Sequence, residues 1–246
     1  DNTLVGGDIL ESYVLHLTQE GALKPQTRDF LADVMLQQRP DLFTPELLAG
    51  KSIEELVTLG HGLRQTKTLS GKDFFHMSVA SLRGLTLDEV KSWARHLYEV
   101  GDADGPYKEH VFDKDSKQKA SASDLLAAMQ AKGITPYVIT AGLRILAQEG
   151  AEYIGVDPKH FLGAELEVQD GLVTGHSSDV GVIGKDNIVR HDIGTPPLFV
   201  FGDSPFTDIP MMKKAILTSF VVHPRPEFAA HAREAKLKCQ RLYFSP

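Results

Sequence analysis

The sequence predicts an α/β protein, with a parallel sheet flanked by helices and an all-helical insert near the N-terminus. From about residue 113 onward, helical and strand patterns alternate, which is typical of a parallel sheet covered by helices. Residues 9 to about 100 show helical spacing throughout, with no convincing strand. We therefore expect a core of residues 1–8 and 113–246, and a helical cap domain of residues 9–112.

The helices of the insert are indicated by apolar spacing and by N-cap residues. The stretch ILESYVLHL (9–17) places its apolar side chains at helical spacing. Thr44 and Ser52 stand before acidic first turns, which is a signal for a helix start. Thr86 begins the amphipathic stretch TLDEVKSWARHLYEV (86–100). The charged stretch DKDSKQK (113–119) is expected to be a solvated connector to the core.

The core elements follow from continuous apolar runs, helical spacing and turn residues. The run PLFVFGD (197–203) has the pattern of a strand buried on both faces. Asp170-Gly171 is a hairpin turn signal inside AELEVQDGLVTGH (164–176). The other expected elements are helices at 121–133, 143–155 and 226–236, and strands at 135–142, 217–223 and 241–244.

Composition limits the class of protein. The chain has 246 residues, 42% of them hydrophobic, enough for one large domain or a core with an inserted smaller one. Its formal net charge is −7 and it has no long basic run, so neither nucleic acid nor an anionic membrane is expected as a main partner. Cys239 is the only cysteine, which excludes an internal disulfide and favours a reducing, cytoplasmic location.

Two carboxylates follow the buried strand in VFGDSPFTDIPMM (200–212). Asp203 and Asp208 would repel each other at a strand end unless a cation lies between them or one is protonated. Oxygen ligands of this kind suit Mg²⁺, which binds one or two carboxylates together with substrate phosphate. The alternative for Asp203 is an N-cap of the next helix.

Three further positions carry weaker signals of the same kind. Thr140 in YVITAG ends a predicted strand, where its hydroxyl and the following backbone N–H groups can bind phosphate, or where it can simply cap a helix. Lys185 in VIGKDNIVR begins a helix, the end that disfavours a cation, so it either has an anionic partner or is a surface lysine. Asp1 opens DNTLVGGD, in which Asp, Thr and paired glycines precede a helix; the alternative is that this stretch is only a turn.

The order and spacing of these motifs resemble the haloacid dehalogenase superfamily, specifically the subfamily IB phosphoserine-phosphatase-like hydrolases with a helical C1 cap. DNTL matches the second half of the first motif, so that Asp1 corresponds to its second aspartate. Thr140, Lys185 and GDSPFTD (202–208) match the second, third and fourth motifs. DGLVTG and IPMM also look like this branch. The resemblance implies a Rossmann-like three-layer core with a parallel sheet.

The resemblance also implies a Mg²⁺-dependent phosphomonoester hydrolase acting through an aspartyl-phosphate. In that family the first aspartate attacks phosphorus, and the second protonates the leaving oxygen and later activates water. The implied catalytic residues are Asp1, Lys185 and Asp208, the phosphate-binding residues are Thr140, Ala141 and Lys185, and the metal ligands are Asp1, Asp203 and Asp208.

The attacking aspartate is expected two residues before Asp1, outside the sequence given. The family's first strand is central and apolar, and five buried aliphatic side chains contribute about 7–15 kcal/mol in sum. A whole domain is stable by only about 5–15 kcal/mol, so we expect an upstream segment that holds this strand. The alternative is a non-catalytic phosphate-binding or regulatory protein on the same fold.

Substrate clues are sparse. Asp8 corresponds to an acidic residue that faces the substrate in this branch, or it is the N-cap of the first helix. Phosphoserine phosphatases carry an arginine before the GLT segment of the cap domain, whereas Arg83 here is too close to the glycine of that segment. Phosphoserine specificity is therefore not implied. The expected partner is a small phosphomonoester, and the chain is expected to be a monomer or homodimer.

Overall fold

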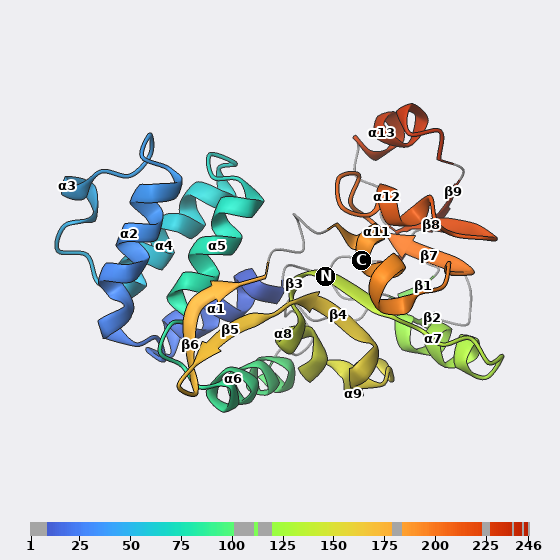
Figure 1. The fold of residues 1–246 in the computed structure, drawn as a ribbon, viewed down its shortest axis with the longest axis horizontal. Coiled ribbons are helices and arrows are strands. Elements are labelled where there is room, and N and C mark those ends of the chain that lie inside the picture. The colour runs from blue at the N-terminus through green and yellow to red at the C-terminus, as the bar shows by residue number, and fades with distance from the viewer. Residues whose placement is uncertain are drawn as a thin grey trace. The chain divides into compact units, whose positions relative to one another are not determined.

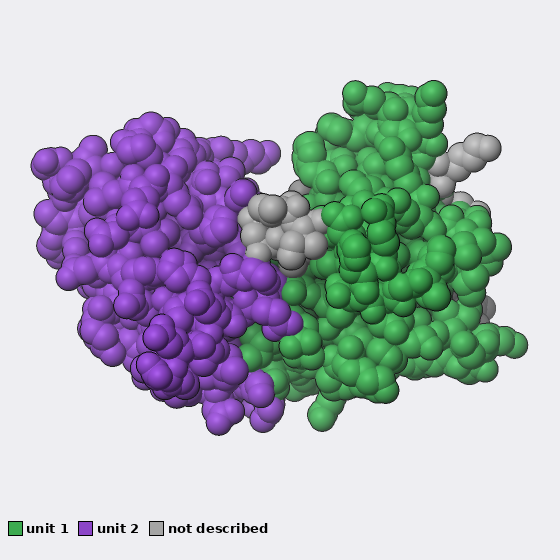
Figure 2. All heavy atoms as spheres, viewed as in Figure 1, with its two compact units in different colours: residues 1–8, 101–163, 179–246 green, residues 9–100, 164–178 purple. Residues whose placement is uncertain are grey.

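The structure is a computed structural model of the 246-residue chain, and it describes residues 9–100, 111–112, 120–178, 184–222, 227–237, 239–242 and 244–245. The chain forms two compact units (Figure 2). The α/β unit comprises residues 1–8, 101–163 and 179–246, and the helical unit comprises residues 9–100 and 164–178. The helical unit therefore includes a later hairpin as well as the N-terminal helices. The predicted connector at 113–119 lies outside the described residues.

Residues 9–100, all of which are described, form helices and turns (Figure 1). Three predicted N-caps are present: Thr44 accepts a hydrogen bond from the N–H of Leu47, Ser52 forms a capping box with Glu55, and Thr86 accepts from the N–H of Glu89. Each cap satisfies a backbone donor that a helix start leaves unpaired. The helices are α1 (Ile9–Gln19), α2 (Arg28–Gln38), α3 (Pro45–Leu48), α4 (Ile53–Gln65), α5 (Gly71–Ser81) and α6 (Leu87–Val100), with a 3₁₀ turn at Pro25–Thr27.

All six helices contribute to the apolar core of the helical unit. Within this core the hydroxyl of Tyr13 donates to the carbonyl of Val90 at 3.1 Å and so ties α1 to α6. The phenol is deeply buried, and burial raises the pKa of Tyr13 far above its ordinary value, with the charge of Glu89 adding to the effect. Fully buried members of this core are Tyr13, Leu17, Leu31, Met35, Leu48, Leu56, Val79 and Val90.

The hairpin of strands β5 (Leu166–Gln169) and β6 (Leu172–Ser177) belongs to the helical unit. Its turn residues Asp170 and Gly171 have φ of 53° and 79°, the left-handed pair that a two-residue hairpin turn needs. Val173 on β6 exchanges backbone hydrogen bonds with the segment that joins α5 to α6, accepting from Gly84 and donating to Leu85. The hairpin predicted at 164–176 is thus confirmed, and it packs with the helices.

The α/β unit contains the alternating elements that the sequence indicates. Its helices are α7 (Ala122–Gln130), α8 (Arg144–Glu149), α9 (Ala151–Ile154), α11 (Lys185–Ile188), α12 (Ile209–Met212) and α13 (Phe228–Glu234). Its strands are β1 (Val111–Phe112), β2 (Ala120–Ser121), β3 (Val138–Leu143), β4 (Phe161–Ala164), β7 (Phe199–Gly202), β8 (Thr218–Val222), β9 (Cys239–Leu242) and β10 (Phe244–Ser245). Short 3₁₀ and π turns lie at Pro158–His160 and Val189–Ile193.

Strands β7, β8 and β9 form a parallel three-stranded sheet in that order, with Val200 opposite Ser219 and Val221 opposite Arg241. A buried apolar cluster joins this sheet to α12 and α13; it contains Val189, Val200, Ile209, Met211, Met212, Val221, Phe228 and Ala232. Strands β3 and β4 pair separately, and β10, β1 and β2 form a small antiparallel sheet. The predicted α/β class with parallel strands is confirmed.

Several local details differ from the sequence prediction, among them the short strands β1 and β2, which were not expected. The helix expected at 143–155 is divided at Gly150 into α8 and α9, because glycine is a poor helix former and weakens the helix at that position. Strand β4 was not predicted, since its sequence FLGA is too short and too small in side-chain size to stand out from a loop. Among the described residues, no helix is long and apolar enough to cross a membrane.

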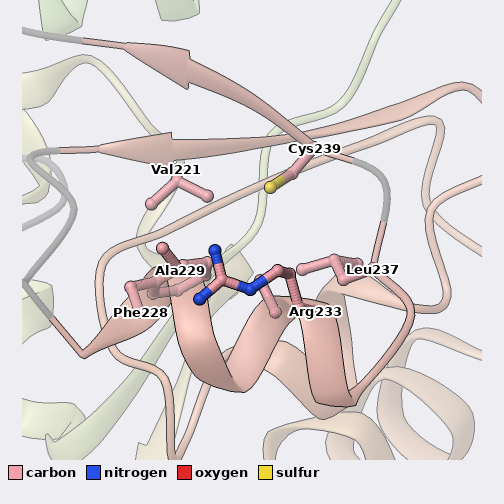
Figure 3. A pocket seen from close by; sticks show the side chains of 7 residues that line it. Val221, Phe228, Ala229, Arg233, Leu237 and Cys239 are labelled. Carbon is pink, nitrogen blue, oxygen red and sulfur yellow. The ribbon is translucent and has the colours of Figure 1, made fainter.

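Figure 3 shows a small pocket between α13 and the strands β8 and β9. Val221 and Cys239 line it from the strands, and Arg233 lines it from the helix. The remaining lining residues are Phe228, Ala229, Ala232 and Leu237, all apolar. None of the predicted site residues lines this pocket, so it is separate from the candidate site described next.

Candidate active site

The candidate site is built on the loop that follows β7. Asp203 comes directly after the strand and Asp208 directly before α12, and they are 8% and 1% exposed. The cap alternative for Asp203 is wrong, because the next helix begins at Ile209 and has Asp208 in the N-cap position. The two buried carboxylates therefore need partners other than the N–H groups of a helix start. They lie at the carboxyl end of a parallel strand, the edge of the sheet where α/β proteins bind ligands.

The carboxylate of Asp208 accepts four hydrogen bonds. Its Oδ1 accepts from Lys185 Nζ at 2.7 Å and from Thr207 Oγ1 at 3.0 Å. Its Oδ2 accepts from the backbone N–H groups of Asp203 and Ser204 at 2.9 and 3.0 Å. An ionised carboxylate has about four acceptor positions, so these protein donors satisfy Asp208 and lock the loop onto it.

Gly202 makes this close approach possible. A Cβ atom at position 202 would lie 2.7 Å from both Cβ and Oδ2 of Asp208 and 2.9 Å from its Cγ. These separations are far shorter than the roughly 3.5–4.0 Å of a normal contact between non-bonded carbon atoms. The last residue of β7 must therefore lack a side chain for Asp208 to fold back onto the strand end.

Lys185 and Asp208 form a buried ion pair, with side chains 13% and 2% exposed. Burial raises the pKa of the Asp208 carboxyl, but the charge of Lys185 and the hydrogen bonds from its ammonium and from two backbone amides outweigh it, so the pKa lies below its ordinary value. The carboxylate is thus held ionised. The surface-lysine alternative for Lys185 is wrong, because the side chain is mostly buried and has an anionic partner at the start of α11.

Thr140 lies within β3 and is 6% exposed. Its Oγ1 accepts a hydrogen bond from the N–H of Gly142 at 2.9 Å. It is not a helix cap, since the N-cap of α8 is Leu143. Strand β3, which also carries Ala141, contacts α11, the helix that Lys185 begins. The structure therefore brings Asp203, Asp208 and Lys185 together and packs the strand of Thr140 against the helix of Lys185.

Two predicted site residues, Asp1 and Asp8, lie outside the described residues. Among the residues that are described, no group of three or more histidine, cysteine, aspartate or glutamate side chains could hold a metal ion. The oxygen chemistry of Asp203 fits Mg²⁺. Asp208 fits less directly, because its oxygens already accept from Lys185, Thr207 and the loop amides. A magnesium ion in this site would need ligands in addition to these two residues.

Two residues of the loop were missed in the sequence. Thr207 donates to Asp208, and Ser204 Oγ accepts from the backbone N–H groups of Phe206 and Thr207, both at 3.3 Å. Their only signal was a position between the two aspartates, which does not say which atoms they reach. Phe206, at the tip of this loop, is 66% exposed and contacts the ring of His231 on α13.

The family model of the haloacid dehalogenase-like hydrolases matches residues 1–213. The chain belongs to this family. The predicted membership of the haloacid dehalogenase superfamily is thereby confirmed, and so is the predicted enzyme class, a hydrolase of this family. No curated protein matches the sequence significantly.

Solved structures share the fold of this haloacid dehalogenase-like hydrolase over nearly its whole length. A protein of unknown function from Bordetella pertussis Tohama I is 15% identical, with 98% of this chain and 94% of that chain covered and a TM-score of 0.62. A phosphoserine phosphohydrolase-like protein from Francisella tularensis is 14% identical, with 96% and 90% covered and a TM-score of 0.52. A substrate-bound phosphoserine phosphatase is 17% identical, with 94% and 86% covered and a TM-score of 0.50. At these identities the matches show the fold, which is the predicted one.

Proposed function

We propose that this hydrolase is a Mg²⁺-dependent phosphatase that acts on a small phosphorylated metabolite through an aspartyl-phosphate. The observation that carries the proposal is the buried pair of Lys185 and Asp208 at the carboxyl end of β7, 2.7 Å apart. An ammonium group has three donors, so Lys185 can hold Asp208 with one and present the others to phosphoryl oxygens. A fixed cation in a partly dry site stabilises the charge that develops on those oxygens.

The metal would be held by Asp203 together with Asp1, and Asp208 would contact it through a water molecule or orient Lys185 beside it. The buried position of Asp203 at a strand end and its hard oxygen ligands support this assignment. When bound, a divalent cation neutralises phosphate charge and orients the phosphoryl group for in-line attack. Thr140 and Ala141 would hold the phosphoryl oxygens from the side of β3.

The chemistry takes two steps. In the first, the aspartate that the family's first motif places two residues before Asp1 would attack phosphorus, the bond to the leaving oxygen would break, and Asp1 would give that oxygen its proton. In the second, Asp1 takes a proton from water, the water oxygen attacks phosphorus, and the acyl-phosphate bond breaks to release inorganic phosphate. In this scheme Lys185 stays paired with the ionised carboxylate of Asp208 through both steps.

The helical unit narrows the substrate class. Arg83 lies with its guanidinium carbon 4.3 Å from the centre of the Phe30 ring, and His176 packs edge-on against the same ring. Arg83 therefore has an aromatic partner within its own unit, and we do not assign it to a substrate carboxylate. Asp8 is proposed to recognise a cationic group on the substrate. An amino-alcohol phosphate or another small phosphomonoester fits these assignments better than phosphoserine.

The test is phosphate release from a panel of small phosphomonoesters, with Mg²⁺ and with a chelator. Asp203→Asn should lower kcat/KM by at least about 10²-fold while the fold is retained. A matched control is Asp157→Asn, which changes an exposed aspartate paired with Lys159 in the same unit and should leave kcat/KM unchanged. Metal-dependent turnover that survives in Asp203→Asn would refute the assignment. Stabilisation of the wild type by phosphate without any turnover would favour the non-catalytic alternative.

A further inference from the structure

Gly163 on β4 lies against the strand that carries Thr140. Strands β3 and β4 are hydrogen-bonded neighbours (Figure 1). A Cβ atom at position 163 would lie 2.6 Å from Thr140 Cγ2, 3.0 Å from the carbonyl oxygen of Gly142 and 3.2 Å from the backbone nitrogen of Arg144. All three separations are shorter than the roughly 3.5–4.0 Å of normal packing. The missing side chain of Gly163 therefore leaves a hollow, and the methyl group of Thr140 fills it.

A single torsion angle places both branches of Thr140. With the methyl group in the hollow, Oγ1 accepts the hydrogen bond from the N–H of Gly142 at 2.9 Å. Threonine is branched at Cβ and has few allowed χ1 rotamers. Thr140 is also only 6% exposed, so it has little room to turn. A group that displaced the methyl from the hollow would rotate χ1 and carry the hydroxyl away from its present position.

The geometry points to Gly163 as a positioning residue that fixes the hydroxyl of Thr140 for phosphate binding. This inference rests on the proposed function, in which that hydroxyl holds a phosphoryl oxygen. Gly163 itself touches neither substrate nor metal in this scheme. It acts through Thr140, because the absence of its side chain selects the rotamer that aims the hydroxyl.

A cycle of four proteins tests the inference: the wild type, Gly163→Ala, Thr140→Ser and the double variant. Serine keeps the hydroxyl but lacks the methyl group that a Cβ at 163 would meet. Gly163→Ala should raise KM and the Kd for inorganic phosphate by about 10- to 100-fold, because misplacing a binding group by about 1 Å is already costly. Its thermal midpoint should fall by about 2–10 °C. Adding Thr140→Ser should restore part of both losses, because it removes the contact with the methyl group but not those with the carbonyl oxygen of Gly142 and the backbone nitrogen of Arg144.

Gly62→Ala is the matched control. Gly62 lies on α4, and a Cβ atom there would have nothing within 4 Å, so this variant should equal the wild type in KM, in phosphate affinity and in activity. A structural role of Gly163 alone would lower the thermal midpoint without changing phosphate affinity, and Thr140→Ser would not rescue it. Wild-type phosphate affinity in Gly163→Ala, or a double variant no better than Gly163→Ala, would overturn the inference.

Different results would overturn the proposed function and the positioning role of Gly163. A wild type with neither turnover nor phosphate binding would overturn the proposed function, and with it the role given to Gly163 in phosphate binding. If the changes in thermal midpoint of the two single variants simply add up to the change in the double variant, Thr140 and Gly163 do not pack against each other, whatever the activity. Titration calorimetry with inorganic phosphate and thermal unfolding of the same four proteins separate these outcomes.

Discussion

Each unit of the chain holds a carboxylate that accepts a hydrogen bond from a lysine ammonium at 2.7 Å, Asp208 from Lys185 in the α/β unit and Glu89 from Lys24 in the helical unit. Asp208 also accepts from two backbone N–H groups close to it in the sequence, and Glu89 accepts from one. The pairs differ in burial. The side chains of Asp208 and Lys185 are 2% and 13% exposed, whereas those of Glu89 and Lys24 are 39% and 31% exposed.

The difference shows that bond length alone does not distinguish a functional pair from a surface pair. Water screens the exposed pair, and such pairs typically contribute only about 0–1 kcal/mol. The buried pair has lost most of its water, so each charge depends on the other for compensation. A charged pair held in this way, beside a second buried carboxylate, is an arrangement that the fold alone does not require, which favours a functional reason for it.

Replacing the lysine of each pair should lower the free energy of unfolding by very different amounts. Lys185→Met leaves the Asp208 carboxylate buried without its cation, and we expect a loss of about 3–5 kcal/mol in the free energy of unfolding. Lys24→Met should cost no more than about 1 kcal/mol, because Glu89 keeps water and the Thr86 N–H as partners. Urea unfolding of both variants measures the difference.

The chain offers a probe that separates the two units in this experiment. Trp93 on α6 is its single tryptophan, so its fluorescence follows the helical unit, while far-ultraviolet circular dichroism follows both units. Lys185→Met should shift the circular dichroism transition more than the Trp93 transition, and Lys24→Met should do the reverse. Equal losses at the two positions would mean that burial does not set the strength of these pairs.

At Gly175 in the helical unit, packing leaves no room for a side chain. A substitution there should destabilise the protein nearly as much as the loss of Lys185 from the buried pair. Gly175 on β6 has φ of 88°, and a Cβ atom would lie 2.5 Å from Cε1 of Phe30 and 3.3 Å from Cβ of Arg83. Gly175→Ala should therefore cost about 2–4 kcal/mol, from the left-handed backbone and from overpacking. The Trp93 transition should move to lower urea. Gly62→Ala in the same unit is the control, and a Gly175→Ala protein as stable as this control would contradict the expectation.

The helical unit was the easier one to predict from the sequence. Its signals are local: Ser52 and Glu55 form their capping box within one turn, and Asp170-Gly171 sets the hairpin turn by its own backbone preference. The assignment of that hairpin to the helices was not predictable in this way. It depends on hydrogen bonds between Val173 and the residues Gly84 and Leu85, which are distant in the sequence.

The site was predictable as a set of residues but not as a geometry. Asp203, Asp208, Thr140 and Lys185 were singled out by their place at element ends and by the order of the motifs. That Asp208 binds Lys185 with one oxygen and the loop amides with the other depends on how the chain folds back at Gly202. Gly163 lies outside every motif, and only its distance from Thr140 shows that it bears on the site.

The smallest expected effect is the pH dependence of the stability that the exposed pair of Lys24 and Glu89 contributes. The hydrogen bond from Lys24, followed by that from the Thr86 N–H, holds the pKa of Glu89 below its ordinary value. A carboxyl with a lowered pKa stabilises the fold above its unfolded pKa of about 4.3, and the contribution is lost as the pH falls through the folded pKa. Glu89→Gln keeps an acceptor for the Thr86 N–H but lacks the charge, so it should lose less than about 1 kcal/mol at neutral pH.

The difference between the wild type and Glu89→Gln should shrink toward zero as the solution is acidified. Asp41 and Glu46 in the same unit also have lowered pKa values, so the pH dependence of the Trp93 transition should weaken in the variant without disappearing. Urea unfolding followed by Trp93 fluorescence at a series of pH values measures this. A difference that grows on acidification would show that the Lys24 pair is not what lowers the pKa of Glu89. The comparison with the buried pair of Lys185 and Asp208 would then have to rest on the lysine substitutions alone.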